Sequence, residues 1–270
     1  MMRVETYDRL DDAARALAGS RTARFLAGGT LVMRAVNAGD QSFDTIVRSR
    51  DASLRAIRPE GDGLTFGAAV TMAEIAAHRD LGFLAPVARI VGGPAVRSMA
   101  TVGGNLYAHN PYGDLATALL ALGATVTLAG SGGGRPIPID DFLRERDRHA
   151  NALVASITIP RPRDPDALRF AKVTRVKPKG VALLSIAAIL PASAGRLRGV
   201  RVAYGGMAAR PTRAQAVERV LEGQTIDATT IDAAARAAAD GFDPPTDSLA
   251  SSWYRREVIG VHLRRLLERR

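Results

Sequence analysis

A proline-rich run divides this chain more firmly than any other feature of its sequence. The segment 160–166 reads PRPRDPD. Proline has no N–H to donate and a fixed φ, so three prolines this close together end any strand or helix. A chain of 270 residues is long enough for one large domain or two ordinary ones. We therefore predict a first domain at 1–160, a linker at 161–166 and a second domain at 167–270.

Hydrophobic periodicity on the two sides of this run predicts an α+β protein. The first domain mixes short strands with helices and shows no regular βαβ repeat; an opening helix begins after Asp8, and further helices are predicted at 71–78, 85–92 and 114–122. The second domain has strands first and helices afterwards, the order typical of α+β folds. Its predicted strands are 168–176, 181–190 and 197–204, and its predicted helices are 212–222, 230–240 and 251–268.

Composition excludes several classes of site. The chain has no cysteine, which rules out disulfides, a cysteine nucleophile, thiolate zinc and a cysteine-bound iron–sulfur cluster in this chain. The 4 histidines are scattered and form no HExxH spacing. We therefore expect no metal site in this chain.

Charge and hydropathy narrow the possible partners. A net charge of +10 raises a nucleic-acid hypothesis, but the arginines are dispersed and aromatic residues make up only 5%. We therefore expect no nucleic-acid partner. No apolar run reaches the about 20 residues of a membrane helix, and the N-terminus lacks a signal-peptide core. These patterns predict a cytoplasmic protein without a membrane span.

Two glycine pairs, each flanked by threonine, are the strongest candidates for a binding site. Paired glycines place no Cβ in the way, so backbone N–H groups can approach an anionic oxygen. Neither pair has the GxGxxG or GxxxxGK[ST] spacing, which argues against the Rossmann and P-loop folds. Tight turns with a purely structural role explain the same pattern equally well. The residues concerned are Leu26, Ala27, Gly28, Gly29, Thr30 and Leu31, then Thr101, Val102, Gly103, Gly104 and Asn105.

Two further residues have a structural and a functional interpretation each. Asp114 precedes an apolar helix, so it is a candidate helix cap as well as an acceptor for ligand hydroxyls. Lys172 is one of three lysines in an arginine-rich chain and lies on a predicted strand, where lysine is usually solvated. His109, Tyr112 and the pair Asp140-Asp141 show no catalytic pattern, and no nucleophile motif is present. No catalytic residue is predicted.

Taken in order, these motifs resemble the FAD-binding medium subunits of the molybdenum hydroxylases, the family of xanthine dehydrogenase and aerobic carbon monoxide dehydrogenase. The resemblance rests on the AGGT-type turn at 27–30, the TVGGN turn at 101–105, and the later segments FAKVTR, VAYGGMAARPTRA and YRR. It covers nearly the whole chain. It implies a two-subdomain FAD-binding fold of the PCMH or vanillyl-alcohol-oxidase type, with subdomains at about 1–55 and 56–160, followed by a smaller α+β domain.

The resemblance also implies residue roles. The two glycine turns would hold the pyrophosphate and ribityl groups of FAD, and Asp114 would accept from cofactor hydroxyls. Lys172 would place a cation beside the flavin, and Val91 and Val154 would line it, although a core role fits both valines. Leu31 departs from the family, which often has Asp, Asn or Ser there. A β-branched side chain at Gly28 or Gly104 is expected to block FAD retention and leave the fold largely intact.

The function implied is electron transfer within a complex. A large partner would carry a molybdenum cofactor and a small partner two 2Fe–2S clusters, in a heterotrimer or its dimer. FAD in this chain would pass the electrons to NAD⁺, a quinone or oxygen. Two alternatives stay open at this point: a stand-alone FAD-dependent oxidoreductase, and, more remotely, a basic nucleic-acid-binding module.

Overall fold

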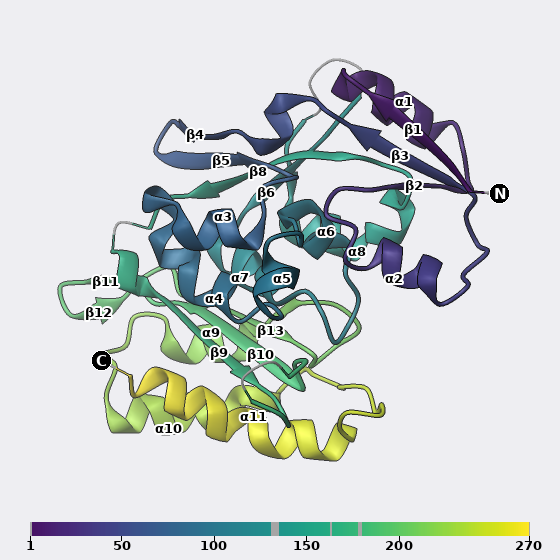
Figure 1. Ribbon diagram of the computed structural model, residues 1–270. Helices are drawn as coiled ribbons and strands as arrows, with labels where there is room; N and C mark the ends of the chain where they lie inside the picture. The colour runs from purple at the N-terminus through teal and green to yellow at the C-terminus, as the bar shows by residue number, and fades with distance from the viewer. Residues whose placement is uncertain (1, 131–134, 163, 178–179, 270) are drawn as a thin grey trace. The chain divides into compact units, whose positions relative to one another are not determined.

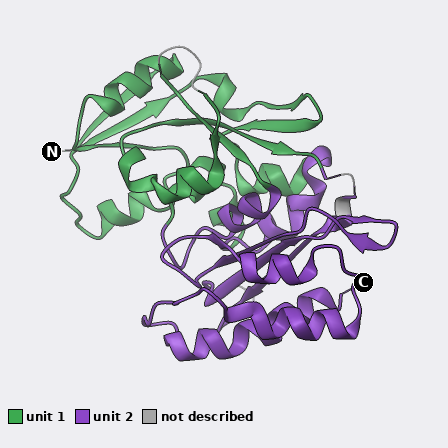
Figure 2. Ribbon diagram, turned by 180° about the vertical axis from the view of Figure 1, so that it is seen from behind, with its two compact units in different colours: residues 1–78, 93–108, 123–161 green, residues 79–92, 109–122, 162–270 purple. Residues whose placement is uncertain are grey.

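The chain forms two compact units, which we describe from a computed structural model (Figures 1 and 2). The structure describes residues 2–130, 135–162, 164–177 and 180–269. Unit 1 comprises Met1–His78, Gly93–Ala108 and Gly123–Arg161, and unit 2 comprises Arg79–Gly92, His109–Leu122 and Pro162–Arg270. Two segments of the predicted first domain thus belong with the second unit. The predicted linker includes residue 163, which lies outside the described residues, and the domain boundaries stay a prediction.

Unit 1 contains two sheets. The N-terminal sheet is parallel, in the order β1-β3-β2, and helix α1 packs on it through Ala13, Ala14 and Leu17. The second sheet is antiparallel, in the order β4-β5-β8-β6-β7. The strands are β1 (Arg3–Tyr7), β2 (Ala23–Phe25), β3 (Thr45–Ser49), β4 (Ile57–Glu60), β5 (Gly63–Gly67), β6 (Thr125–Leu128), β7 (Ile137–Pro138) and β8 (Val154–Pro160).

The helices of unit 1 are short and several begin at side-chain caps. In α3, Thr71 and Glu74 form a reciprocal capping box, which satisfies two N–H groups that the first turn leaves free. The helices are α1 (Leu10–Ala18), α2 (Val32–Asn37), α3 (Met72–Ala77), α5 (Pro94–Arg97), α6 (Val102–Tyr107) and α8 (Ile139–Arg144), with 3₁₀ turns η1 (Ala52–Arg55) and η3 (Arg146–His149).

Unit 2 is built on one antiparallel sheet, in the order β14-β13-β10-β9, with helices on both faces (Figure 1). Alternate residues of β10 face opposite sides: Leu184, Ile186 and Ala188 join the core with α9, α10 and α11, whereas Ser185 faces α7. All residues of α7 are buried. The strands are β9 (Leu168–Val173), β10 (Leu184–Ile189), β13 (Arg201–Gly205) and β14 (Thr212–Arg213), beside the hairpin β11 (Ala192–Ser193) and β12 (Arg196–Leu197).

The helices of unit 2 include the longest of the described chain. They are α4 (Ala85–Arg89), α7 (Asp114–Leu122), α9 (Gln215–Leu221), α10 (Ala228–Arg236) and α11 (Ser252–Leu267), with 3₁₀ turns η2 (Arg79–Leu84), η4 (Pro165–Ala167) and η5 (Ala237–Ala239). The α+β class and the order of strands before helices in the second half are confirmed. The sequence prediction missed β1, and it treated 101–105 as a turn, whereas 102–107 is a helix.

A buried arginine ties the segment before α11 to the sheet. Arg255 is 2% exposed, and its Nε donates to the carbonyl of Leu183 at 3.0 Å. Its Nη2 binds both carboxylate oxygens of Asp247 at 2.9 and 3.0 Å, and its Nη1 donates to the carbonyls of Pro245 and Ala250. The planar guanidinium donates to three carbonyl groups and one carboxylate at the same time. The single nitrogen of a lysine cannot reach all of these acceptors.

Arg255→Ala is expected to lower the free energy of unfolding by about 3–5 kcal/mol, because it removes the hydrogen bonds of a buried guanidinium to Asp247 and to three carbonyl groups. Arg255→Lys should recover only part of this loss. The control is Arg219→Ala, an exposed position on α9, where a change within about 0.5 kcal/mol is expected. Urea unfolding measures all three variants, and equal stability of Arg255→Ala and Arg219→Ala would contradict the assignment.

Candidate cofactor-binding site

The first glycine turn presents a row of free backbone donors. It links β2 to α2 and is anchored at its start, where the N–H of Leu26 donates to the carbonyl of Val47 at 2.8 Å. Gly29 has a φ of 72°, a conformation that favours glycine. Within the described part of the chain, the N–H groups of Gly28 through Leu31 have no acceptor. Consecutive unpaired N–H groups in such a turn form an anion-binding concavity.

In the second glycine turn the backbone N–H groups are hydrogen-bonded within the chain. This turn forms the first turn of α6. The N–H groups of Val102 and Gly103 donate to the carbonyls of Val70 and Ala68, at 2.9 and 2.8 Å. The N–H of Gly104 donates to Thr101 Oγ1 at 3.2 Å. These three donors are therefore occupied within the chain. What this turn can offer a ligand is the exposed side of Gly104, where an added Cβ would meet only Thr101 Oγ1, at 3.1 Å.

The structure brings the two turns together in unit 1 through Gly28. A Cβ built on Gly28 would lie 1.6 Å from the carbonyl oxygen of Met99, two residues before Thr101. Glycine is required here so that two backbones can touch. The expectation that a side chain at Gly28 leaves the fold intact is therefore wrong, whereas for Gly104 the structure is compatible with it.

In unit 2, Asp114 and Lys172 form a buried ion pair. Lys172 Nζ donates to Asp114 Oδ2 at 2.7 Å and to the carbonyl of Ile90 at 3.2 Å. The side chain of Asp114 is 7% exposed and that of Lys172 is 10% exposed. Burial raises the pKa of Asp114, and the ammonium of Lys172 opposes that rise. Asp114 is the first residue of α7, and its carboxylate accepts a hydrogen bond from Lys172.

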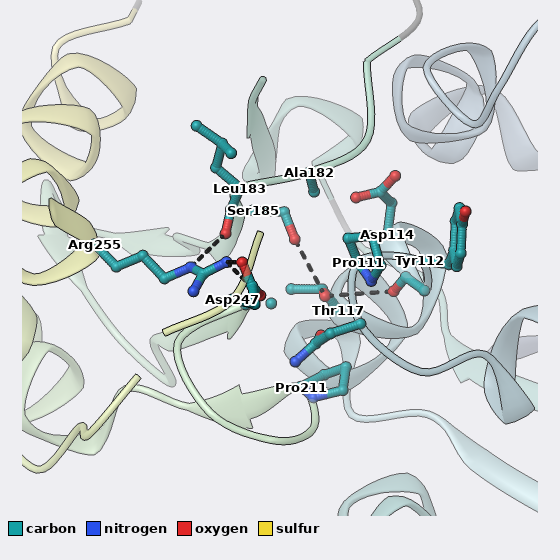
Figure 3. Close-up of a pocket in the computed structure, with 14 residues that line it drawn as sticks. Pro111, Tyr112, Asp114, Thr117, Ala182, Leu183, Ser185, Pro211, Asp247 and Arg255 are labelled. Atoms are coloured by element: carbon teal, nitrogen blue, oxygen red, sulfur yellow. Dashed lines mark hydrogen bonds and ion pairs between the residues drawn. The ribbon is translucent and has the colours of Figure 1, made fainter. Parts of the chain in front are cut away.

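This ion pair lies at one end of a polar layer between α7 and β10. Thr117, one turn after Asp114, accepts from Ser185 Oγ at 3.4 Å. A Cβ on Gly205 would lie 2.5 Å from Ser185 Oγ and 2.7 Å from Thr117 Oγ1, so glycine leaves room for both hydroxyls. Asp114, Thr117 and Ser185 line one pocket (Figure 3). Sequence reasoning missed Thr117, Ser185 and Gly205, although the i, i+3 spacing of Asp114 and Thr117 was a usable signal.

The remaining predicted residues divide between the units. Val154 is buried in β8 of unit 1, as a core residue is, and Val91 is half-buried in unit 2 just after the Ile90 carbonyl that Lys172 reaches. Asp140 and Asp141 lie in the first turn of α8 and pair with Arg144, which gives them a structural role. The binding roles assigned to individual residues stay predictions.

The described residues contain neither a candidate metal site nor a candidate membrane span. They contain no cluster of three or more His, Cys, Asp or Glu side chains that could hold a metal ion. No described helix is both long and apolar enough to cross a membrane.

Gly28→Ala and Gly104→Ala are expected to separate the structural glycine from the exposed one. Gly28→Ala forces two backbones apart and should lower the free energy of unfolding by about 1–3 kcal/mol, the range of overpacking changes. Gly104→Ala meets only a hydroxyl and should stay within about 1 kcal/mol of the parent, the size of the Gly-to-Ala difference in a helix. Thermal and urea unfolding of the two variants test this, and similar losses in both would contradict it.

Comparison with known proteins agrees with this geometry. Residues 1–162 match the family described as "FAD binding domain in molybdopterin dehydrogenase", and residues 169–269 match "CO dehydrogenase flavoprotein C-terminal domain". The glyceraldehyde dehydrogenase medium chain of Sulfolobus acidocaldarius is 29% identical, over 94% of this chain and 92% of that protein. The carbon monoxide dehydrogenase medium chain of Afipia carboxidovorans is 28% identical, over 92% and 88%.

A solved structure shares the fold from end to end. The reconstituted CO dehydrogenase from Oligotropha carboxidovorans superposes with a TM-score of 0.88 at 25% identity, over 100% of this chain and 97% of that chain. The sequence-based resemblance and fold class are confirmed. This chain belongs to the family of FAD-binding medium subunits of the molybdenum-dependent dehydrogenases.

Proposed function

We propose that this chain is the FAD-containing electron-transfer subunit of a multi-subunit molybdenum-dependent dehydrogenase. It receives electrons from the 2Fe–2S clusters of a small partner and passes them to NAD⁺, a quinone or oxygen. A large partner holds the molybdenum cofactor and oxidises the substrate, in a cytoplasmic heterotrimer or its dimer. The observation that carries the proposal is the row of free N–H groups from Gly28 to Leu31, in a chain of this family.

The residues of the first turn fit a dinucleotide cofactor. Four adjacent N–H dipoles can meet the two negative charges of a pyrophosphate, and hydrogen bonds to a charged acceptor are the strong ones. No Cβ closes the exposed side of Gly104, so the cofactor can approach there, and Thr101 and Asn105 flank it. When bound, FAD supplies the redox chemistry, since it can accept electrons singly and deliver them in pairs.

The ion pair between Asp114 and Lys172 in unit 2 changes what Lys172 would contribute as a cation beside the flavin. A lone lysine beside the flavin would favour the anionic, reduced cofactor. Here Asp114 lies 2.7 Å from Lys172, so the two side chains together form a dipole with no net charge. We assign to Asp114 the task of orienting the Lys172 ammonium and of limiting its effect on the reduction potential.

Three variants test this division of roles by the reduction potential of bound FAD. Asp114→Asn leaves the Lys172 charge uncompensated and should raise the potential, with about 30 mV for each ~1.4 kcal/mol in a two-electron couple. Lys172→Met should lower it, and the double variant should return close to the parent. Equal potentials in all four proteins would remove both residues from the cofactor's surroundings.

FAD content tests the proposed function itself. The complex, and the chain alone after incubation with FAD, should show the visible absorption of oxidised flavin and release one FAD per chain on denaturation. Gly104→Val should lose the flavin with little change in unfolding, because its side chain fills the open side of the turn. The matched control is Gly82→Val, an exposed glycine with no atom within 4 Å of its Cβ position.

A flavin-free parent complex would refute the assignment as an FAD subunit. Stoichiometric FAD in Gly104→Val would show that the cofactor does not approach that face of the second turn.

A further inference from the structure

The outer face of α11 carries apolar side chains where a surface helix normally has polar ones. The helix packs on α10, β9 and β10 and covers one side of the sheet of unit 2 (Figure 1). Trp253, the one tryptophan of the sequence, is 69% exposed, the highest value among the large apolar side chains described. Val261 is 46% exposed and Tyr254 is 38% exposed. An amphipathic helix turns its apolar residues inward, so this face indicates a contact with another molecule.

Five exposed residues form a stripe along α11 and the residue that follows it. Residues three and four apart are neighbours on a helix surface, and the spacings within this set are 3, 4, 4 and 3 residues. The set is therefore symmetric about its middle member, Val261. We call it the α11 stripe, and its members are Tyr254, Glu257, Val261, Arg265 and Glu268.

The two inner charges of the stripe are unpaired, whereas other cations of the same helix have partners. Within the described ranges, the side chains of Glu257 and Arg265 make no ion pair or hydrogen bond. By contrast, Arg255 binds Asp247, and Arg264 binds Asp232. Glu257 and Arg265 also lie about 12 Å apart along the helix axis, too far to pair with each other. Both charges are thus available to a second molecule.

A second α11 in antiparallel orientation is complementary to this stripe. In a two-fold interface one surface patch meets its own copy, so a contact between two different residues occurs twice. With the axis at Val261, residues equally far before and after Val261 face each other. Glu257 then meets Arg265 of the second copy, and Tyr254 can donate its hydroxyl hydrogen to the Glu268 carboxylate of that copy. Val261 packs against itself at the centre.

The charge pattern favours a second copy over a partner of one sign. A uniformly acidic surface would be repelled by Glu257 and Glu268, and a uniformly basic one by Arg265. Two chains of net charge +10 repel each other at a distance. At physiological salt the screening length is about 8 Å, so the contacts within the interface decide the association.

We propose that the α11 stripe docks a second copy of this chain, as an antiparallel helix pair with a two-fold axis at Val261. A helix of 16 residues is about 24 Å long, which gives an interface at the small end of the range. The dimer therefore forms reversibly, in proportion to concentration. This inference does not depend on FAD binding.

Charge reversal tests the pairing of Glu257 with Arg265. In sedimentation equilibrium, the average mass of the full chain should rise with concentration toward two chains. Glu257→Arg and Arg265→Glu should each raise the Kd of the dimer by about tenfold, because each replaces two attractive contacts with two repulsive ones. The double variant exchanges the charges across the axis and should dimerise like the parent. The matched control is Arg219→Glu, an exposed position on α9, which should also dimerise like the parent.

The absence of cysteine from the sequence allows a second test, of the position of the axis. Under mild oxidation, Val261→Cys should form a disulfide-linked dimer, because the residue on the axis faces its own copy. Two cysteines in Ser252→Cys dimers would lie about 27 Å apart along the helices, beyond the reach of a disulfide. This variant, on the same helix, should stay unlinked. A non-reducing gel separates the two results.

Three results would overturn the proposal. The first is a parent chain that stays monomeric at every concentration while Val261→Cys forms no cross-link. The second is a double charge reversal that associates more weakly than either single variant, which excludes antiparallel self-pairing. The third is a monomeric parent chain whose single reversals weaken binding to a different subunit, which would assign the stripe to that interface. Urea unfolding of each variant verifies that its fold is intact.

Discussion

The close approach of Gly28 to the carbonyl of Met99 is the contact on which the candidate site depends. The 1.6 Å between that oxygen and an added Cβ means that no other residue can occupy position 28 without moving a backbone. The contact fixes the free N–H groups of the first turn beside the second turn. The N–H groups of the second turn are already hydrogen-bonded, to the carbonyls of Val70 and Ala68 just after β5 and to the Thr101 side chain. The first turn therefore supplies the free hydrogen-bond donors. The second turn holds the first in place through Met99 and leaves one side of Gly104 exposed.

Unit 2 buries polar side chains between its sheet and helix α7. One side of β10 is purely apolar and packs on α9, α10 and α11, while the other carries Ser185 toward α7. There the polar groups satisfy one another: Ser185 with Thr117, and Lys172 with Asp114. Partnered polar groups are tolerated in a low-dielectric interior, whereas single ones are costly.

Much of the fold could be predicted from the sequence, because its strongest signals are local. The apolar run at 114–122 is α7, residue for residue, and the Thr71 cap with Glu74 three residues later is a capping box. Strand β1 was missed because its exposed side chains hide the alternation that marks a half-buried strand. Helix α6 was missed because two glycines disfavour a helix, and the Thr101 cap and the packing of Gly103 on Ala68 outweigh that preference.

The site was less predictable, because its contacts join distant segments. Both glycine turns were identified by composition and by resemblance, but no local pattern shows that Gly28 meets Met99. The pairing of Asp114 with Lys172, 58 residues apart, was equally out of reach, and it changes a lone cation into a neutral pair. Local sequence patterns thus identified the candidate residues. Only the tertiary structure showed which of them contact or hydrogen-bond one another.

The division of the chain between its units has a consequence for biosynthesis. Segments Arg79–Gly92 and His109–Leu122 are made early but belong to the unit whose sheet comes from the second half of the chain. Helix α7, buried along its whole length against β10 and β13, therefore leaves the ribosome long before those strands exist. During that interval its apolar surface lacks the sheet of its own unit, the condition under which nascent chains associate wrongly. The completed C-terminal sheet ends this exposure, so unit 2 folds as one body only when synthesis is nearly finished.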